Sequence, residues 1–192
     1  MEQAEIIRQP TLAGMAIAPD GPFPAISHAH HVAYRSNDAE ATRHFYEDIL
    51  GLPLVCVLRF PPNAAGFGIP HPFVHIFFRM ASGACIAFFD FGDNRKVEFD
   101  APSWCNHIAM QVKDEAALQE AWHRLNEAGV KVDYLRDHGF CRSIYMYDPS
   151  GNRVELTTPT PNEDAVWAHE KAEAKTVLAQ WLAERPGIKR PA

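Results

Sequence analysis

The sequence lacks the features that mark several large classes of protein. No run of apolar residues approaches membrane-spanning length, and the acidic start Met1-Glu2-Gln3-Ala4-Glu5 is not followed by the apolar segment of a secretory signal. Lysine and arginine are scattered along 192 residues with a formal net charge of −6, so no basic stripe is available for phosphates. We therefore expect a cytoplasmic protein that binds neither membranes nor nucleic acid.

Cysteine is also scarce and unpaired in the sequence. Cys56, Cys85, Cys105 and Cys141 lie far apart, and no Cys-x-x-Cys pair suggests a zinc site or a redox couple. They are expected to be reduced and mostly packed, with a catalytic cysteine as the alternative. Because 47% of the residues are apolar, the chain can bury a substantial core.

Two parts of the sequence repeat one pattern. In each, an apolar strand segment (31–34 and 107–110) leads into an aspartate, then a helical stretch, then a glycine. Asp38 and Asp114 stand where the helices should begin, and Gly51 and Gly129 where they should end. Aspartate caps the first turn of a helix, and glycine adopts the left-handed conformation that ends one. The pattern predicts a strand followed by a helix in both parts.

The repeat continues without a gap when residues 76–87 are superposed on residues 144–155. Ser82-Gly83 then falls on Ser150-Gly151, which predicts a tight hairpin turn in both parts. Each part is thus expected to be a βαβββ module.

The predicted fold is α+β, with two tandem βαβββ modules whose curved sheets surround a metal-binding cavity and whose helices lie outside. The modules span about residues 28–92 and 104–158 within a domain of residues 25–160. Residues 1–24, rich in proline, are expected to form an N-terminal arm, and residues 161–192 a C-terminal amphipathic helix and tail. Because Trp167 and Trp181 would be costly to expose, this helix should dock on its own domain or on a second subunit, and we expect a homodimer.

Alternation of side chains along each strand assigns one face to the helices and the other to the cavity. The cavity face carries polar and aromatic residues together, which is typical of a ligand site. In addition to the metal-site residues, it includes His75, Phe77, Arg79 and Tyr147, which we predict to bind substrate.

His31 and His107 occupy the same position of the repeat, and Glu155 lies on the last strand with its side chain on their face. Two imidazoles and one carboxylate form a facial triad that leaves positions of an octahedral metal open. A single histidine on a strand is more often structural, but the repeat equivalence favours a divalent metal held by His31, His107 and Glu155.

The sequence resembles the vicinal oxygen chelate superfamily. The resemblance rests on His31-Val32-Ala33, on residues 45–52 (FYEDILGL) and on residues 148–155 (DPSGNRVE), and it covers roughly residues 28–158. These motifs are specific for the fold and much less so for the reaction, because the superfamily includes glyoxalases, epimerases, extradiol dioxygenases and metal-free drug-binding proteins.

The residue at the end of the first module separates these activities. Glyoxalase-like members are expected to place a glutamate there as a fourth ligand, whereas the repeat puts Ala87 at this position. Asp90 could replace it only through a strand bulge. The site therefore resembles that of small extradiol ring-cleaving dioxygenases, which implies Fe(II), with Mn(II) as the alternative, and a catechol-like aromatic substrate with O2.

The resemblance also implies roles for His138 and Tyr145. The segment Asp137-His138-Gly139 before residues 143–147 is similar to the segment that gives extradiol enzymes an acid–base histidine and a tyrosine. Histidine titrates near neutral pH and can carry protons, and a tyrosine can stabilise charge on a bound substrate oxygen. The alternative for Tyr145 is an aromatic that only lines the cavity.

The sequence departs from the larger extradiol enzymes at one position. Those enzymes are expected to have another pocket histidine near the position of Ala84, and this sequence has none there. His75 could take part of that role. Two other functions stay open: a glyoxalase-like metal-dependent lyase or isomerase, and a metal-free binding protein of the resistance type.

Overall fold

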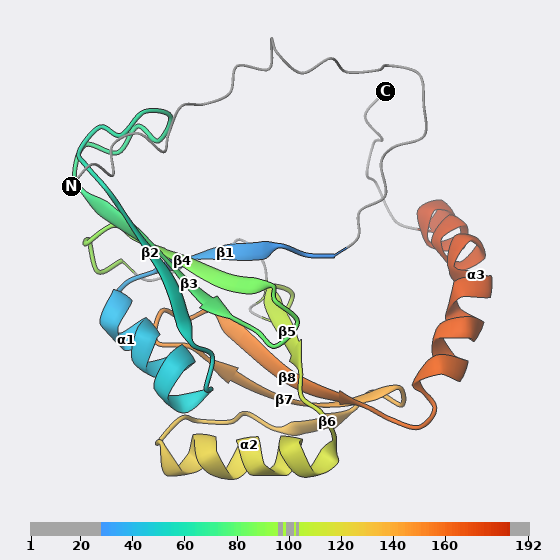
Figure 1. Cartoon of the computed structure of the whole chain (residues 1–192). Coiled ribbons are helices and arrows are strands. Elements are labelled where there is room, and N and C mark those ends of the chain that lie inside the picture. Colours follow the sequence, from blue (N-terminus) through green and yellow to red (C-terminus); the bar gives the residue numbers. More distant parts are fainter. Residues whose placement is uncertain (1–27, 96–97, 99–101, 103, 185–192) are drawn as a thin grey trace. The chain divides into compact units, whose positions relative to one another are not determined.

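The structure, a computed structural model, describes residues 28–95, 98, 102 and 104–184 (Figure 1). These residues form two units, divided between Val97 and Glu98, and the structure defines the arrangement within each unit. Each unit contains one of the predicted βαβββ modules. The predicted arm over residues 1–24 lies outside the described residues.

Unit 1 holds one four-stranded sheet in the order β1-β4-β3-β2. Strand β1 runs parallel to β4, and the other pairs are antiparallel. A helical segment connects β1 to β2. The elements in chain order are β1 (His31–Ser36), α1 (Ala39–Arg43), the π-helix η2 (His44–Ile49), β2 (Leu54–Phe60), β3 (Phe73–Arg79) and β4 (Cys85–Asp90).

Unit 2 repeats this topology with the strand order β5-β8-β7-β6 and a parallel β5–β8 pair. Figure 1 shows α2 covering one face of this sheet. The elements are β5 (His107–Gln111), α2 (Glu115–Glu127), β6 (Leu135–Asp137), β7 (Cys141–Tyr147), β8 (Arg153–Pro159) and α3 (Glu163–Glu184). The tandem βαβββ modules predicted from the repeat are confirmed.

The predicted caps and turns are formed by the predicted residues. The carboxylates of Asp38 and Asp114 each accept a hydrogen bond from the backbone of the third residue onward, at 2.9 Å in both helices. The two hairpins are also alike, because Gly83 and Gly151 both have a φ near 90° and donate to the carbonyl three residues earlier. A residue with a Cβ atom would be strained at these two turns.

The helix of unit 1 differs from the expected regular helix, because it widens into a π-helix after Arg43. The backbone N–H of Leu50 reaches the carbonyl of Phe45 at 3.0 Å, one residue further than in an α-helix. Phe45 and Tyr46 are adjacent yet both buried, and the Tyr46 ring packs against Phe88 at 4.7 Å between centroids. Periodicity alone did not predict this turn, since it depends on the aromatic residues beneath it.

The core of each unit lies between its sheet and its helix, as the alternation predicted. In unit 2, Leu118 and Leu125 of α2 are buried against the apolar face of the sheet, which presents Met110, Ile144, Met146, Val154 and Leu156. Burial of each such side chain contributes about 1.5–3 kcal/mol to folding. This rigid layer leaves the opposite face of the strands to carry the polar and aromatic residues.

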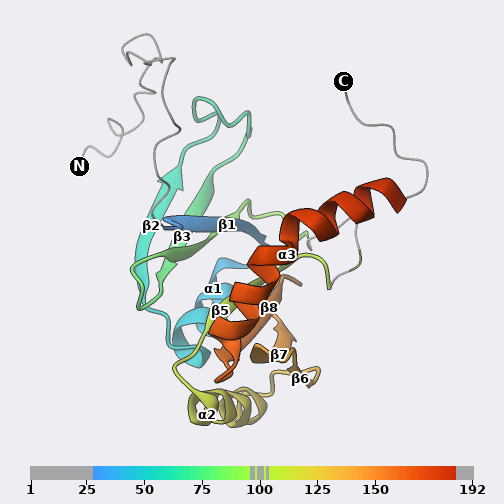
Figure 2. The same ribbon diagram turned by 90° about the vertical axis from the view of Figure 1, so that its right-hand side faces the viewer.

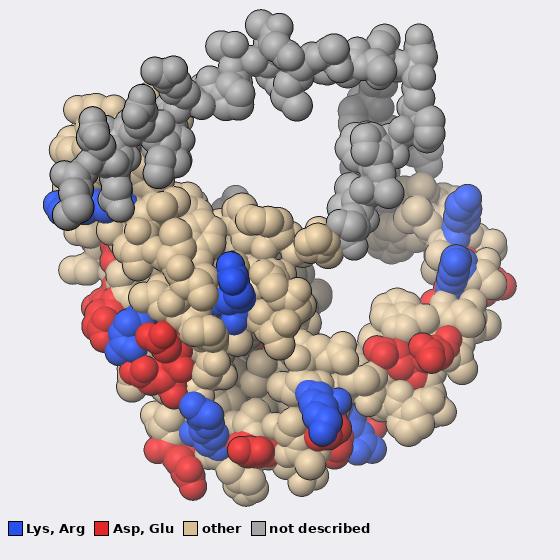
Figure 3. All heavy atoms as spheres, viewed as in Figure 1, with Lys and Arg blue, Asp and Glu red and all other residues tan. Residues whose placement is uncertain are grey.

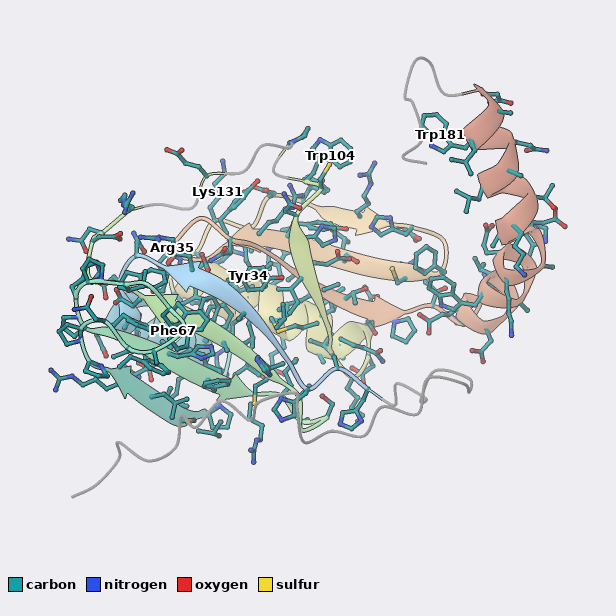
Figure 4. The ribbon with its side chains drawn as sticks, turned by 90° about the horizontal axis from the view of Figure 1, so that it is seen from above. Tyr34, Arg35, Phe67, Trp104, Lys131 and Trp181 are labelled. Carbon is teal, nitrogen blue, oxygen red and sulfur yellow. The ribbon has the colours of Figure 1, made fainter. Side chains whose placement is uncertain are left out.

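Helix α3 follows β8 and extends away from the strands of unit 2 (Figure 2). None of its 22 residues is buried, and Trp181 at its far end is 57% exposed (Figure 4). Docking of this helix along its length on its own unit is therefore not observed among the described residues. Pairing with a second subunit stays a prediction.

The described residues have mixed surface charge and free cysteine thiols. On the face in Figure 3, basic and acidic groups of the described residues are interspersed and no continuous basic stripe is seen. None of the described helices is long and apolar enough to cross a membrane. The four cysteines are free thiols, with Cys85 and Cys141 buried, Cys56 half-buried and Cys105 exposed.

Candidate metal and substrate site

The strand register places Ala87 and Glu155 at equivalent positions. Ala87 lies opposite Ala33 in the β1–β4 pair, and Glu155 lies opposite Ala109 in the β5–β8 pair. The superposition made from the sequence is therefore correct for this pair. The first module offers a methyl group where the second offers a carboxylate.

His107 and Glu155 approach each other at the parallel β5–β8 pair. The His107 Nε2 atom lies 2.9 Å from Oε2 of Glu155, whose residue is 6% exposed. The other ring nitrogen, Nδ1, lies 3.1 Å from the backbone carbonyl oxygen of Trp104. A carbonyl oxygen only accepts, so Nδ1 carries a proton and donates it there.

This arrangement directs two electron-rich atoms at each other. With Nδ1 protonated, a neutral imidazole presents the lone pair of Nε2 to the carboxylate oxygen of Glu155, and the two atoms repel each other. A cation shared between them turns this contact into an attraction. That cation is either a second proton on the imidazole or a metal ion, because both atoms are good donors to divalent metals. The carbonyl of Trp104 acts as an orienting partner of the kind that metal-binding histidines use. The donor set therefore fits a metal.

His31 belongs to unit 1, whereas His107 and Glu155 belong to unit 2. Among residues 28–95, 98, 102 and 104–184, no group of three or more His, Cys, Asp or Glu side chains is placed to hold a metal ion. The structure thus brings together two of the three predicted ligands. Convergence of His31 on the same metal stays a prediction.

The Asp90 carboxylate accepts hydrogen bonds from two backbone N–H groups of unit 1. Its Oδ2 atom accepts from the backbone N–H of Ala39 at 2.7 Å, and its Oδ1 atom accepts from Gly92 at 2.7 Å. The β4 ladder runs regularly through Asp90, so the bulge needed to turn this side chain to the other face is absent from the described strand. Asp90 anchors the start of α1 and does not act as a fourth ligand in this arrangement.

Tyr145 lies beside Glu155 in the β7–β8 register and is 6% exposed. Its hydroxyl group is 2.8 Å from Nε2 of His138. Burial, reinforced by the Glu155 carboxylate, raises the pKa of Tyr145 to about 12. The phenol is therefore neutral near pH 7 and available as a hydrogen-bond donor.

Arg153 supports the Tyr145 ring from the side, a contact that the sequence interpretation missed. Its guanidinium carbon lies 4.7 Å from the centroid of that ring, and the Arg153 side chain also bonds the hydroxyl groups of Tyr134 and Tyr147. Tyr147 is 37% exposed and does not line the cavity of unit 2. A substrate contact by Tyr147 stays a prediction.

His138 is held in the turn between β6 and β7. Its backbone N–H bonds the carbonyl of Cys141 at 2.9 Å, and Gly139 follows with a φ of 84°. The Oδ1 atom of Asp137 accepts from the N–H of Gly139 at 2.7 Å. The Asp-His-Gly segment therefore forms a turn that directs the imidazole toward Tyr145.

A cavity of about 400 Å³ in unit 2 joins these groups. The residues that line it include four that the sequence predicted as metal-binding or catalytic: His107, His138, Tyr145 and Glu155. It also includes residues not predicted for the site, among them Phe140, Cys141, Glu163 and Trp167. The sequence predicts Trp167 only as a residue of the C-terminal amphipathic helix, because its spacing does not show which turn of that helix contacts the sheet.

In unit 1, His31 lies with His75 and Phe77 on the predicted face. The ring centroid of His31 is 6.3 Å from that of His75 and 5.6 Å from that of Phe77. His31 also faces His30, with the two Nδ1 atoms 2.8 Å apart. Arg79 ends the same strand and is exposed. The ring contacts place His75 and Phe77 on the same face as His31, while substrate contacts by His75, Phe77 and Arg79 stay predictions.

His75 is an unusual buried group. It is 7% exposed, stacks on Phe89 with centroids 3.7 Å apart, and its Nε2 atom is buried without a hydrogen-bond partner among the described residues. Burial, with the nearby His31, lowers the pKa of His75 to about 4. The imidazole is therefore neutral near pH 7 and packs as a buried ring against Phe89.

The structure thus contains two βαβββ modules, and the second carries a cavity lined by His107, His138, Tyr145 and Glu155. The model of the Glyoxalase/Bleomycin resistance protein/Dioxygenase superfamily matches residues 28–156. The chain belongs to this family, the vicinal oxygen chelate superfamily.

Solved structures share the fold at low sequence identity. A glyoxylase/bleomycin resistance protein/dioxygenase domain from Frankia sp. EAN1pec is 17% identical with a TM-score of 0.58, covering 71% of this chain and 100% of that one. A glyoxalase/dioxygenase from Nostoc punctiforme is 18% identical with a TM-score of 0.52, covering 73% and 99%. TnmS3, an antibiotic-binding protein from Streptomyces sp. CB03234, is 21% identical with a TM-score of 0.51, covering 71% and 98%. At these identities the likeness concerns the fold alone.

Proposed function

We propose that this protein is an Fe(II)-dependent extradiol dioxygenase that cleaves a catechol or related dihydroxylated aromatic ring. The observation that carries the proposal is the presence of two adjacent groups in one cavity: the His107–Glu155 pair, 2.9 Å apart, and the His138–Tyr145 pair, 2.8 Å apart. The first pair supplies metal donors, and the second supplies a proton carrier and a neutral hydrogen-bond donor.

His107 and Glu155, with His31 as the third ligand, would hold the metal. The bound ion would supply a positive charge that favours ionised catechol oxygens and open positions for substrate and O2. Mn(II) suits the same donors. A three-ligand set agrees with the methyl group of Ala87 and with the use of Asp90 at the start of α1.

Tyr145 would donate its hydroxyl hydrogen to a substrate oxygen. Because its pKa is raised to about 12, the phenol holds its proton and acts as a donor rather than a base. A donor fixed by the Arg153 guanidinium and the β7–β8 ladder needs little rearrangement as negative charge develops on the substrate.

His138 would carry the proton that the reaction moves. Its Nε2 atom already lies at hydrogen-bond distance from the Tyr145 hydroxyl, so a proton can pass between imidazole and substrate oxygen directly or through that hydroxyl. The turn formed by Asp137 and Gly139 keeps the ring at the cavity while leaving it partly accessible to solvent.

The test is reconstitution without oxygen. Protein loaded with Fe(II) anaerobically should consume O2 and form a yellow ring-fission product when a panel of catechols is added. Glu155→Gln should lose iron and activity, whereas Glu163→Gln should keep its iron, since Glu163 lines the same cavity but is not a proposed ligand.

Other outcomes distinguish the alternatives. A protein that retains one metal per chain but consumes no O2 across the panel would contradict the dioxygenase and favour a lyase or isomerase. A protein that retains no stoichiometric iron, manganese or zinc would favour metal-free ligand binding.

A further inference from the structure

Two aromatic side chains form part of the cavity wall in unit 2. The rings of Phe140 and Trp167 lie 5.1 Å apart at an angle of 56°, and both residues line the cavity. Phe140 follows His138 in the β6–β7 turn, with 6.0 Å between their ring centroids. Trp167 comes from α3 and is 54% exposed, so a large part of its indole surface is open to a ligand.

The start of α3 is tied to the turn that holds His138. The backbone N–H of Thr160 donates to the carbonyl of Phe140 at 2.9 Å, and its hydroxyl group donates to the carbonyl of Gly139 at 2.8 Å. One residue thus fixes the beginning of the last helix against the carbonyls that flank Phe140. The backbone before Trp167 is therefore hydrogen-bonded to the turn that carries His138. These bonds hold the indole and the imidazole at the same cavity.

Next to α3 the cavity carries the Glu163 carboxylate, and none of the described residues that line the cavity is Lys or Arg. An anionic ring substituent near α3 would meet the Glu163 carboxylate without a compensating cation from these residues. Uncharged substituents avoid this repulsion.

We propose that Phe140 and Trp167 form an aromatic subsite that binds the ring of a planar substrate without an anionic substituent. The subsite deepens the proposed dioxygenase function, on which it rests, by restricting the substrate class to uncharged catechols. Aromatic faces offer offset-stacked or edge-to-face contacts that an aliphatic wall does not. The 22-residue helix α3 therefore serves the cavity through its second turn.

The chain supplies its own control. Trp181 lies on the same helix with a similar exposed fraction, 57% against 54% for Trp167, but does not line the cavity. A general effect of losing an exposed tryptophan from α3 would appear in both variants. An effect specific to the subsite would appear only at Trp167.

The experiment measures binding by calorimetry under anaerobic conditions, so that no turnover is required. The probes are 4-methylcatechol and 3,4-dihydroxybenzoate, which differ in the anionic group. Trp167→Leu should raise the Kd for 4-methylcatechol about three- to tenfold, while Trp167→Phe and Trp181→Leu stay within about twofold of wild type. Wild type should bind 3,4-dihydroxybenzoate at least about fivefold more weakly, and Glu163→Gln should reduce that difference.

Tryptophan emission gives a second readout. Binding of 4-methylcatechol should quench the emission of wild type, and Trp167→Phe should bind but lose most of the quenching. The proposal is overturned if wild type binds neither probe, if Trp167→Leu binds as wild type does, or if Trp181→Leu loses as much affinity. Binding through Trp167 without O2 consumption would keep the subsite and reject the dioxygenase, whereas O2 consumption unaffected by Trp167→Leu would do the reverse.

Discussion

The imidazole of His107 is fixed at both nitrogens, by the Trp104 carbonyl at 3.1 Å and by the Glu155 carboxylate at 2.9 Å. The first contact leaves the second nitrogen facing a carboxylate oxygen, where only a proton or a metal ion can be shared. Since an imidazole must be unprotonated at the donor nitrogen to bind a metal, metal and proton compete for this position.

Substitution of Glu155 by Gln should separate metal binding from folding. The amide keeps the shape of the side chain but removes its charge, so the affinity for Fe(II) should fall at least about 100-fold, beyond the usual cost of losing an orienting partner. Competition with a colorimetric chelator measures the affinity. Unchanged affinity in Glu155→Gln would remove this carboxylate from the metal site.

Substitution of Asp90 by Ala should lower the stability of the protein without changing its metal binding. The Asp90 carboxylate accepts from the Ala39 N–H at the start of α1, so its loss should lower the free energy of unfolding by about 1 kcal/mol. The iron content of the folded protein should not change. Loss of iron in this variant, measured beside Glu155→Gln, would show that Asp90 is a ligand after all.

Tyr145 and Tyr147 provide a matched pair on one strand. Tyr145→Phe should lower kcat about 100-fold with the iron content retained, because a buried donor to the substrate oxygen is lost. Tyr147→Phe should leave kcat within about twofold, because it keeps the ring of the predicted substrate contact and removes only a hydroxyl group outside the cavity lining. Equal effects of the two substitutions would assign Tyr145 a structural role only.

His138→Asn should lower kcat about 100-fold or more and remove a proton-dependent limb from the pH profile of kcat. Binding of 4-methylcatechol should be kept, because the imidazole is proposed to move protons rather than to hold the ring. His169→Asn, on the exposed part of α3, is the control. A uniform loss across the pH range, with the profile unchanged, would contradict the acid–base role.

The stability of the metal-free protein should depend on His75 in weakly acidic solution. The pKa of this group is lowered from 6.5 to about 4 by burial, so between these values the unfolded chain binds a proton that the folded chain does not. The stabilising contribution is fully present above pH 6.5 and is lost as the pH falls toward 4, on the order of 3 kcal/mol. Urea unfolding of wild type and His75→Phe across this range measures it. An identical pH dependence in the two proteins would refute the assignment.

Local patterns were sufficient to predict the modules and the faces of their strands. Asp38, Asp114, Gly83 and Gly151 determine the caps and turns through short-range chemistry, and strand alternation places His107 beside Glu155. These features follow from the residues themselves and from the fixed period of a strand.

Contacts made by loops and chain ends could not be predicted in this way. The Trp104 carbonyl reaches His107 through a turn whose conformation spacing does not encode. Trp167 enters the cavity wall because Thr160 ties the start of α3 to the His138 turn, a tertiary contact between residues 21 positions apart in the case of Gly139. The π-helix likewise depends on the packing of Tyr46 against strands that follow it in the chain.

The metal itself offers the most direct measurement. X-ray absorption at the iron edge, on protein loaded anaerobically with Fe(II), counts imidazole ligands by their multiple scattering. The account predicts two imidazoles in wild type and one in each of His31→Ala and His107→Ala, with His75→Phe unchanged at two. A wild-type spectrum without imidazole scattering, or the same count in His31→Ala as in wild type, would contradict it.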